Sequence, residues 1–499
     1  MEIPKEIQSI IKELENKGFE AYIVGGCVRD FLLARQSESE GGRKIKPQDW
    51  DIASNAKPED VQKIFLKNFL ENKFGTVTVL TGSKDESLAE IEITPYRIDE
   101  KYTDKRHPDK VIWAEKIEQD LSRRDFTINA LAMAIGKVKK KSETKIIDLF
   151  GGEKDLKNKI IRAVGSPQDR FSEDALRMMR AARFATTLGF EIEKKTAAAI
   201  KDNSHLLKAI SRERIRDELM KIIMSENADE GIELLRELNL LKYIIPELEE
   251  GHGVSQNKHH VYEVYKHSLL SLRYAAQKNF NKYVRMATLL HDIGKPRVKK
   301  GEGQNATFYN HEVVGAKMTC QILDSLRFSK KDIEKITKLV RYHLFYYHPD
   351  EVGESSVRRL VRQVGPENME ELLQVRLADR IGSGCPKAEP YKLRYLKYVI
   401  DKTSQDSISV KNLKISGNDI MEILKIAPGP KVGMILDILL GEVLENPEKN
   451  KKEILEKETG KLGKLSEEEL KKFTQKARQE REKIEIKRDE MTKKKYWVT

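Results

Sequence analysis

The chain of 499 residues is 39% hydrophobic and 34% charged, which predicts a soluble, helix-rich protein of two to four domains. Its net charge of +12 suits a polyanionic partner, although a lysine-rich surface would give the same excess. Three widely spaced cysteines (Cys27, Cys320 and Cys385) disfavour a disulfide framework and favour a reducing, cytoplasmic location. We expect neither a signal peptide nor a membrane span, because no long apolar stretch occurs.

A glycine turn is the first functional candidate along the chain. An apolar run from Tyr22 to Val24, then Gly25 and Gly26, then a helical pattern predicts a strand, a tight turn and a helix. Adjacent glycines let a ligand approach the backbone closely, and the amide groups at a helix start favour an anion. A Gly–Gly pair on its own is more often only a turn. The polar segment 34–46 that follows is expected to be a surface loop.

Carboxylates on two expected strands form the second candidate. In the segment 49–53, strand alternation puts Asp49 and Asp51 on one face and the apolar side chains on the other. Two such carboxylates repel unless a divalent cation lies between them, and Mg²⁺ prefers oxygen ligands and bridges to phosphate. In the later segment 89–94, Glu90 and Glu92 share one strand face, and a glutamate on this neighbouring strand would complete a two-metal site.

Five motifs occur in a fixed order along the chain. They are Gly25-Gly26-Cys27-Val28-Arg29-Asp30, Asp49-Trp50-Asp51-Ile52, Arg123-Arg124-Asp125-Phe126-Thr127-Ile128-Asn129-Ala130, Asp148-Leu149-Phe150-Gly151-Gly152 and Glu173-Asp174-Ala175-Leu176-Arg177. This order resembles the class II tRNA nucleotidyltransferases, or CCA-adding enzymes, and the related bacterial poly(A) polymerases over most of residues 1–450. The resemblance implies template-independent addition of CCA to the 3′ end of tRNA from CTP and ATP.

The resemblance also implies roles for individual residues. Asp49 and Asp51 would hold two Mg²⁺ ions, and Glu92 would act as the third carboxylate or as a base. One ion would activate the RNA 3′-hydroxyl, and the other would steady the triphosphate and the leaving pyrophosphate. Nucleotide binding falls to Gly25, Gly26, Arg29, Asp30, Arg124, Asn129, Asp174 and Arg177.

Two segments between residues 96 and 130 have more than one interpretation. The resemblance implies that the charged stretch 102–111 is a flexible loop that reshapes the site between CTP and ATP, with an ordinary mobile loop as the alternative. The run from Arg123 to Phe126 is predicted to open an amphipathic helix. Two arginines at a helix start oppose the helix dipole unless they serve an anion, and a salt bridge to Asp120 or Asp125 is the structural alternative.

Asp174 and Arg177 lie three residues apart in an expected helix and so share one face. Such a pair is usually a surface ion pair of little energetic weight. Cytosine and adenine, however, each present an exocyclic amine beside a ring-nitrogen acceptor, which a carboxylate and a guanidinium match. Uracil and guanine reverse this pattern and would leave buried charges unpaired. The resemblance assigns base selection to this pair, with Glu173 orienting Arg177.

Eight of the ten histidines fall between His252 and His348. Neutral imidazoles grouped with aspartates make a transition-metal or Mg²⁺ site, whereas a lone helix histidine is more often a satisfied core residue. The order resembles the HD phosphohydrolase superfamily, which implies metal binding with or without catalysis. The matching ligands would be His267, His291, Asp292 and Asp379, with His311 and His343 available for a second metal.

The expected fold is α+β, with a small mixed-sheet head followed by all-α domains. We place a nucleotidyltransferase head at 1–150, a neck for base recognition and RNA binding at 151–250, an HD-type domain at 251–400, a tRNA-binding tail at 401–450 and a charged extension at 451–499. Glycine and proline signals predict two helices joined by a turn in the tail, where Lys431 is a candidate phosphate contact. The extension has a thin apolar stripe and is expected to be a solvated helix or a partly disordered arm.

Three alternatives stay open at this point. A poly(A) polymerase shares the head but generally lacks an intact histidine set. An enzyme that adds only the terminal A, or only cytidines, shares the head motifs, although C-adding relatives lack the loop at 102–111. A phosphohydrolase with an RNA-binding head is the rival from another class.

Overall fold

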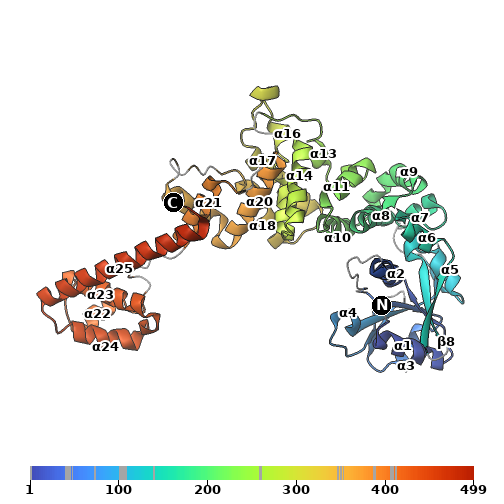
Figure 1. The fold of residues 1–499 in the computed structure, drawn as a ribbon, viewed down its shortest axis with the longest axis horizontal. Coiled ribbons are helices and arrows are strands. Elements are labelled where there is room, and N and C mark those ends of the chain that lie inside the picture. The colour runs from blue at the N-terminus through green and yellow to red at the C-terminus, as the bar shows by residue number, and fades with distance from the viewer. Residues whose placement is uncertain are drawn as a thin grey trace. The chain divides into compact units, whose positions relative to one another are not determined.

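The computed structural model describes residues 3–39, 47, 49–71, 75–100, 110–138, 141–257, 261–345, 348, 351, 353–385, 389–404, 410 and 413–498. They belong to two compact units, one of residues 1–343 and 374–385 and the other of residues 344–373 and 386–499. A mixed sheet followed by helices confirms the expected α+β fold (Figure 1). Within that description, none of the helices combines the length and the apolar character that crossing a membrane requires.

The head is built on a seven-stranded sheet with the order β3-β4-β5-β2-β1-β8-β9. Its strands are β1 (Ala21–Val24), β2 (Asp51–Ser54), β3 (Asn68–Leu70), β4 (Val77–Leu80), β5 (Glu90–Pro95), β8 (Leu131–Val138) and β9 (Lys141–Asp148). Strands β2 and β5 run parallel, whereas the other neighbours are antiparallel. A separate pair, β6 (Arg97–Glu100) and β7 (Lys110–Trp113), flanks residues 101–109, so most of the loop predicted at 102–111 lies outside the described residues.

One face of this sheet is apolar and forms the core of the head. The cross-strand partners Ile23, Ile52, Ile93 and Val77 make a row whose side chains are all fully buried. Helices α1 (Lys5–Asn16) and α3 (Pro58–Ile64) contact each other and the strands of the sheet (Figure 1). Because strand residues alternate between faces, the next row along must face the opposite side.

Helix α2 (Gly26–Ser39) corrects the prediction of a loop at 34–46. The helix continues through Ala34, which is almost fully buried and lies three residues after the buried Phe31. That spacing keeps Ala34 on the apolar side of the helix, which explains why the polar composition did not end it there. Residues 40–46 of the same segment lie outside the described residues.

The rest of the first unit is almost entirely helical from residue 152 onward, apart from the short parallel pair β10 (Ile160–Ile161) and β11 (Glu191–Ile192). The main helices are α6 (Gly152–Lys157), α7 (Pro167–Glu173), α8 (Leu176–Leu188), α9 (Lys194–Asn203), α10 (Arg212–Ile223), α11 (Ala228–Glu237), α14 (Val264–Gln277), α15 (Lys282–Leu290), α17 (His311–Ser325) and α18 (Lys330–Tyr342). Residues 374–382 of α20 (Met369–Gly382) complete this unit.

The second unit is helical and includes the C-terminal extension. Its helices are α19 (Glu354–Val364), α21 (Tyr391–Ser404), α22 (Gly417–Leu424), α23 (Pro430–Glu445), α24 (Lys452–Leu462) and α25 (Glu467–Tyr496). Helices α22 and α23 confirm the two helices predicted around a glycine and proline turn. Lys431, the candidate phosphate contact, donates to the carbonyl oxygen of Gly463 at 2.9 Å.

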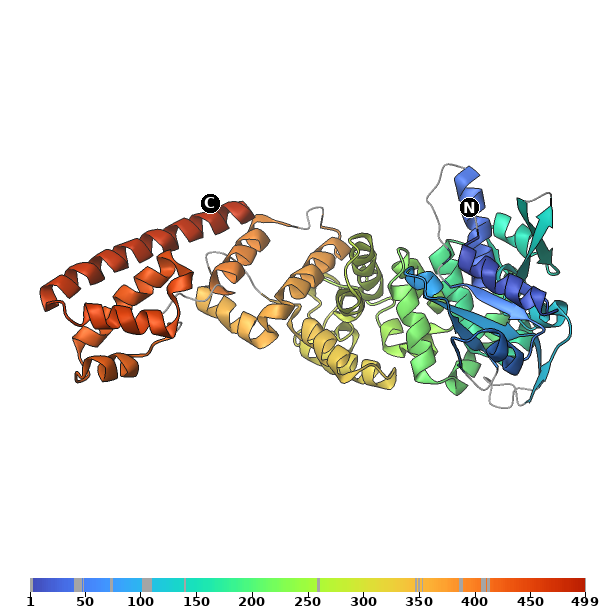
Figure 2. The same cartoon turned by 90° about the horizontal axis from the view of Figure 1, so that it is seen from below.

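Most of the extension is helical, in α24 and α25, and its thin apolar stripe is enough to pack it. Leu470 is fully buried in a core cluster that also contains Leu439 and Leu455. Further along α25, the carboxylate of Asp489 accepts a hydrogen bond from the Tyr398 hydroxyl. Helix α25 therefore contacts both α23 and α21, and Figure 2 shows it running alongside them in red.

Candidate active site and histidine metal centre

The polar face of the head sheet carries the predicted catalytic carboxylates. Asp51 opens β2, and its register partner on the parallel strand β5 is Glu92. Asp49 lies two residues before Asp51, and all three carboxylates line one cavity. Trp50 and Ile52, which point the other way, are 4% and 0% exposed. The observed alternation is the one that the sequence predicted.

Partial burial makes Asp51 and Glu92 reluctant to ionise together. Burial raises the pKa of Asp51 to about 6 against the opposing charge of Arg124, and the negative charges of Asp49 and Glu71 add to the rise. Burial and then the charge of Asp51 raise the pKa of Glu92 to about 7. A hard divalent cation takes oxygen ligands and would relieve this repulsion, so the donor set fits such an ion.

The glycine turn lies directly beside the carboxylates. Gly25 has a φ of +79°, and a Cβ added there would lie 2.9 Å from an Nη atom of Arg124 and 3.7 Å from Oδ2 of Asp51. A side chain at this position would therefore be strained by its backbone and would also crowd the guanidinium. Strand β1 ends at Val24 and α2 begins at Gly26, which confirms the predicted strand, turn and helix.

The arginine pair at 123–124 is not at a helix start, which corrects that prediction. Helix α5 (Ile117–Ser122) ends just before Arg123, where cations suit the helix dipole. Asp120 accepts from both arginines, at 2.5 Å from Arg123 and 3.1 Å from Arg124. The buried residues that follow form a 3₁₀ turn (Thr127–Asn129) and then β8, because their apolar side chains enter the sheet instead of a helix face.

A chain of hydrogen bonds connects α2 to α8 through Asp125. Arg29 donates to the side-chain oxygen of Asn129 at 2.8 Å, and Nδ2 of Asn129 donates to Oδ1 of Asp125 at 3.1 Å. Oδ2 of Asp125 accepts from Nε of Arg180 at 2.7 Å. Burial alone would raise the pKa of Asp125, but Arg180 and Asn129 outweigh it and hold the pKa at about 2. Asp30, the remaining residue of the glycine motif, accepts from Arg29 at 2.8 Å.

The proposed base-selecting pair does not share one helix, since Asp174 stands at the break between α7 and α8. The backbone of Asp174 is extended, which ends the first helix. The Leu176 amide donates to Oδ1 of Asp174 at 3.0 Å, and this hydrogen bond leads into the second helix. The Asp174 carboxylate accepts from Arg214 at 2.7 and 3.3 Å. Arg177 donates to Glu173 at 2.6 Å, the contact that an orienting role for this glutamate requires. It also donates to the Arg123 carbonyl at 3.0 Å.

One cavity of about 820 Å³ gathers the head and neck candidates. Its lining includes every residue that we predicted to be catalytic or nucleotide-binding, namely Gly25, Gly26, Arg29, Asp30, Asp49, Asp51, Glu92, Arg124, Asn129, Asp174 and Arg177. Nine of the lining residues are arginine or lysine, which suits a triphosphate.

Sequence reasoning missed Phe184 in this cavity. Its ring lies 5.1 Å from the Arg29 guanidinium, 5.3 Å from that of Arg180 and 3.9 Å from that of Arg183. The ring makes cation–π contacts with all three guanidinium groups. Its apolar position on α8 was the only local signal, and that signal also describes an ordinary core residue.

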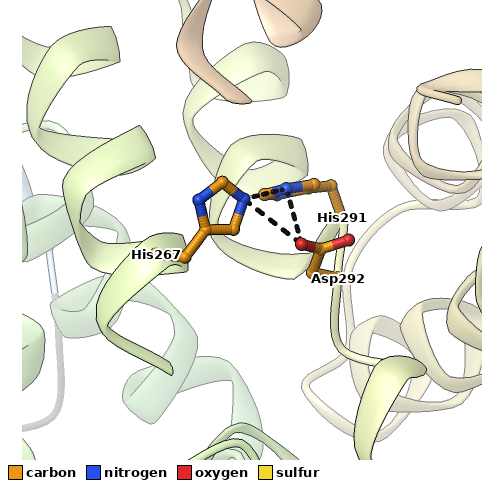
Figure 3. A group of neighbouring side chains, drawn as sticks. All are labelled: His267, His291 and Asp292. Atoms are coloured by element: carbon orange, nitrogen blue, oxygen red, sulfur yellow. Dashed lines mark hydrogen bonds and ion pairs between the residues drawn. The ribbon is translucent and has the colours of Figure 1, made fainter. Parts of the chain in front are cut away.

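The predicted histidine ligands converge in the first unit. Nε2 of His267 lies 2.9 Å from Nε2 of His291, and each lies 3.2 Å from Oδ2 of Asp292 (Figure 3). Oδ1 of Asp379 is 3.3 Å from His267 and 3.7 Å from His291. These four side chains come from α14, the end of α15 and α20, and their facing donor atoms could surround a single cation.

A second set of donors meets the other oxygen of Asp292. Nε2 of His311 lies 3.4 Å from Oδ1 of Asp292, and Nε2 of His343 lies 3.7 Å from the same atom. The two imidazoles are 3.3 Å apart through their Nε2 atoms. One aspartate therefore stands between two clusters, as expected for a bridging ligand of a two-metal site.

Electrostatics in this buried cluster favours a cation. Burial opposes a charge on His291, but Asp292 and Asp379 outweigh it and raise its pKa to about 10. Burial and the charge of His291 lower the pKa of His343 to about 3, so that imidazole stays neutral and able to bind metal. A bound metal ion would neutralise the carboxylates of Asp292 and Asp379, which otherwise favour a proton on His291.

Lys295 is a further residue of this centre that sequence reasoning missed. Its Nζ donates to Oδ2 of Asp292 at 2.6 Å and to Oε1 of Gln256 at 2.7 Å. The side chain is only 5% exposed, and its three-residue spacing from Asp292 was the available signal. This ammonium restrains the rotamer of the Asp292 carboxylate.

Comparison with known proteins agrees with this layout. Family models match as "Poly A polymerase head domain" at residues 21–162, "Probable RNA and SrmB-binding site of polymerase A" at 189–251 and "HD domain" at 258–383. Head and HD domains both imply the use of divalent metal ions. The CCA-adding enzyme of Bacillus stearothermophilus, solved in complex with CTP, superposes with a TM-score of 0.57 at 28% identity, covering 92% of this chain and 97% of that one.

Curated relatives show the same family along most of the chain. The chain spans about half the length of the first of them, such as the CCA-adding enzyme of Lactobacillus helveticus, which is 46% identical over 46% of this chain and 53% of its own length. The CCA-adding enzyme of Lactococcus lactis subsp. lactis is 31% identical over 92% of this chain and 98% of its own length. That of Enterococcus faecalis is 32% identical over 90% of this chain and 94% of its own length. The chain therefore belongs to the family of CCA-adding enzymes.

Proposed function

We propose that this protein adds CCA to the 3′ end of tRNA from CTP and ATP, without a nucleic-acid template, in the cytoplasm. The observation that supports this best is one cavity lined both by the carboxylates Asp49, Asp51 and Glu92 and by the pair Asp174 and Arg177. A cavity of this kind combines the chemistry of phosphoryl transfer with a filter for the incoming base. The CTP in the Bacillus stearothermophilus structure agrees with such a substrate.

The carboxylates would hold Mg²⁺, which supplies charge neutralisation at the α-phosphate and activation of the attacking hydroxyl when bound. The chain's own contribution is to position the reactants, because phosphoryl transfer depends mainly on alignment and electrostatic stabilisation. Arg124 and Arg29 offer guanidinium donors to the triphosphate beside the open backbone of Gly25. Glu92, the register partner of Asp51, is placed to act as the third carboxylate or to accept the proton of the RNA hydroxyl.

Base selection would rest on two side chains that are held in place from behind. Arg214 fixes the Asp174 carboxylate, whose remaining lone pairs accept from the exocyclic amine of cytosine or adenine. Glu173 fixes the Arg177 guanidinium, which donates to the ring nitrogen. Uracil and guanine would set a donor against the guanidinium and an acceptor against the carboxylate. Rigid anchoring makes that mismatch costly, since neither side chain can turn away freely.

Incorporation on a tRNA transcript that lacks its 3′ end tests this function, with CTP alone, ATP alone and both, at single-nucleotide resolution. We expect two cytidines, then one adenosine, then a stop. An unbounded adenosine ladder would make the protein a poly(A) polymerase, and a single adenosine on CC-ended tRNA would make it an A-adding enzyme. Asp49→Ala should abolish incorporation while leaving circular dichroism unchanged; retained activity would overturn the metal assignment.

The six-ligand histidine centre supports a second, accessory function as a metal-dependent phosphohydrolase, with Mg²⁺ or a transition metal bound. Asp292 stands between two donor clusters, which is the arrangement that two-metal phosphoester hydrolysis requires. RNA ending in a 2′,3′-cyclic phosphate is the substrate we would test. His291→Ala should remove hydrolysis and spare CCA addition, and Asp49→Ala should do the reverse. Loss of both activities in either variant would argue against two separate sites.

A further inference from the structure

Helix α10 presents one of its faces to the nucleotide cavity. Arg214 and Lys221 of this helix both line the cavity. Glu218, which stands between them, accepts a hydrogen bond from Arg183, another residue of the lining. Positions 214, 218 and 221 have the spacing of side chains that share one helix face. Arg214 also holds the carboxylate of Asp174, so the placement of α10 affects the proposed base-selecting pair directly.

The opposite face of α10 contacts the part of the chain that matches the HD domain. Arg216 lies about 200° around the helix from Arg214. Its guanidinium donates to the carbonyl oxygen of Arg327 and lies 5.9 Å from the ring of Phe328. Both of these residues belong to the connection between α17 and α18, within the HD domain match at 258–383. The HD domain therefore holds α10 near the start of the helix.

A buried arginine of the HD domain holds the other end of α10. Arg285 on α15 is 2% exposed. Its Nη1 donates to the carbonyl oxygen of Ile223 at 3.0 Å and to that of Ser225 at 2.7 Å. Ile223 is the last residue of α10, so these carbonyl groups are among those that a helix end leaves without an intrahelical partner. A cation at this position also suits the negative end of the helix dipole.

The remaining donors of Arg285 bind the end of α14 and the turn that follows it. Nη2 donates to the Ala276 carbonyl at 3.4 Å and to the side-chain oxygen of Asn279 at 3.3 Å, and Nε donates to the Phe280 carbonyl at 2.9 Å. A guanidinium has five N–H donors, and the five hydrogen bonds of Arg285 use them all. One side chain thereby joins α10, α14 and α15 in a fixed geometry.

We propose that the HD domain positions α10 for base selection, with Arg285 holding one end of the helix and Arg216 the other. The proposal rests on the proposed function, and it gives the HD domain a part in nucleotide addition that is separate from its metal centre. Lys221 stands two residues before the end that Arg285 holds. The helix has 12 residues and is about 18 Å long, so a shift at this end also displaces Arg214.

A positioning role differs from a purely structural one in its kinetic signature. Loss of folded protein lowers the apparent kcat, because less enzyme is active, and leaves KM unchanged. Displacement of α10 instead weakens the hold on the incoming base, which raises the KM for the nucleotide and lowers the preference for the correct base. The proposed catalytic carboxylates Asp51 and Glu92 belong to β2 and β5, so the chemical step should be largely retained.

Steady-state kinetics on the full-length protein test this role, with a tRNA transcript that lacks its 3′ end as the acceptor. Arg285→Lys keeps the positive charge but has three donors in place of five. We expect it to raise the KM for CTP about tenfold and to lower the preference for CTP over UTP about tenfold, the effect of losing one hydrogen bond from a charged donor. The kcat with CTP should stay close to that of wild type.

Arg216→Ala tests the other end of α10 independently. Arg216 is partly exposed, with a side chain at 26% of full exposure, so this variant should fold even where a change at the buried Arg285 prevents folding. It should change the same two quantities in the same direction, to a smaller extent. Circular dichroism of each variant checks that the protein is folded before its kinetics are compared.

Arg273→Ala is the matched control. Arg273 on α14 donates to Asp229 on α11 at 2.7 Å, so it also joins the HD domain to a preceding helix. The described lining of the nucleotide cavity, however, includes no residue of α11. The variant should therefore leave both the KM for CTP and the preference for CTP over UTP unchanged.

Two results would overturn the positioning role. One is an unchanged KM for CTP and unchanged selectivity in the folded Arg285 and Arg216 variants, and the other is an equal rise in KM in Arg273→Ala. Wild-type protein that incorporates no nucleotide would refute the proposed function itself. Normal incorporation by wild type together with unaffected Arg285→Lys and Arg216→Ala would refute only the positioning role of the HD domain.

Discussion

Asp125→Asn offers a quantitative check on the hydrogen-bonded chain between α2 and α8. The wild-type carboxylate accepts from Arg180 and Asn129, and these partners hold its pKa at about 2, well below the usual value of an aspartate. The difference of nearly two pKa units corresponds to about 2 kcal/mol of folding free energy at neutral pH. The variant would also turn an amide N–H toward the Arg180 guanidinium, setting donor against donor.

The pH dependence of this stabilisation follows from the lowered pKa of Asp125. A carboxyl group with a lowered pKa in the folded state stabilises the fold above its unfolded pKa, and this contribution is lost as the pH falls through the folded value. We therefore expect Asp125→Asn to be less stable by about 2 kcal/mol at pH 7, with about half of that difference left near pH 3. Amide hydrogen exchange of peptides from α8 and β8 measures the local opening free energy.

One outcome of the hydrogen-exchange experiment would refute this reasoning. If the exchange difference between Asp125→Asn and wild type were the same at pH 7 and near pH 3, charge on Asp125 would not be the source of the stabilisation. Asp169→Asn provides a matched control, because Asp169 is an aspartate of the neighbouring helix α7 with no part in the chain of hydrogen bonds. It should leave exchange in α8 and β8 unaffected at both pH values.

Three further predictions follow from burial and backbone geometry. Gly25→Ala should destabilise the head by about 1–2 kcal/mol, measured by chemical denaturation, because φ is +79° and the new Cβ would crowd Arg124; a neutral effect would contradict the tight turn. Burial raises the pKa of Cys27 to about 12. Maleimide at pH 8 should therefore label Cys320 in the native protein and leave Cys27 unmodified, and mass spectrometry would detect this difference. Equal labelling of the two cysteines would show that the turn is open. Leu470→Ala should destabilise the second unit by about 2–4 kcal/mol and speed exchange in α23, and unchanged exchange would mean that α25 is not packed there.

Much of the head site could be predicted because short stretches of sequence determine its local structure. The alternation around Asp51 needs only the period of a strand, and the turn at Gly25 needs only the chemistry of glycine. The predicted histidine ligands also meet as a set, with Asp292 in contact with both His267 and His311. In these cases few other structures or functions would place the same residue types in the same order.

The failures occur where a local pattern admits two structures. The apolar residues after Arg123 fit a helix period, but they enter a 3₁₀ turn and a strand because β8 needs them to fill the sheet. The three-residue spacing of Asp174 and Arg177 suggested one helix face, whereas Asp174 in fact ends one helix and leads into the next. Tertiary packing overrides the local preference in both cases.

Other features are invisible to sequence reasoning because they depend on pairing between distant segments. Arg285 reaches the end of α10 only because α15 packs against that helix, and no motif contains this arginine. Arg214 supports Asp174 from a helix that starts 38 residues later, at Arg212. The same holds for α25, whose thin apolar stripe looked insufficient until α21 and α23 supplied its partners.

The segregation of charge along one sheet face gives the site a direction. The carboxylate row is desolvated enough to raise the pKa values of Asp51 and Glu92, so it attracts cations and repels a bare phosphate. Nine arginine and lysine residues line the cavity of about 820 Å³, whereas the described lining of a neighbouring cavity of about 610 Å³, which shares Asp49, Asp51 and Glu92, has seven carboxylates. A group that carries free phosphates is therefore attracted to the first cavity and repelled from the second.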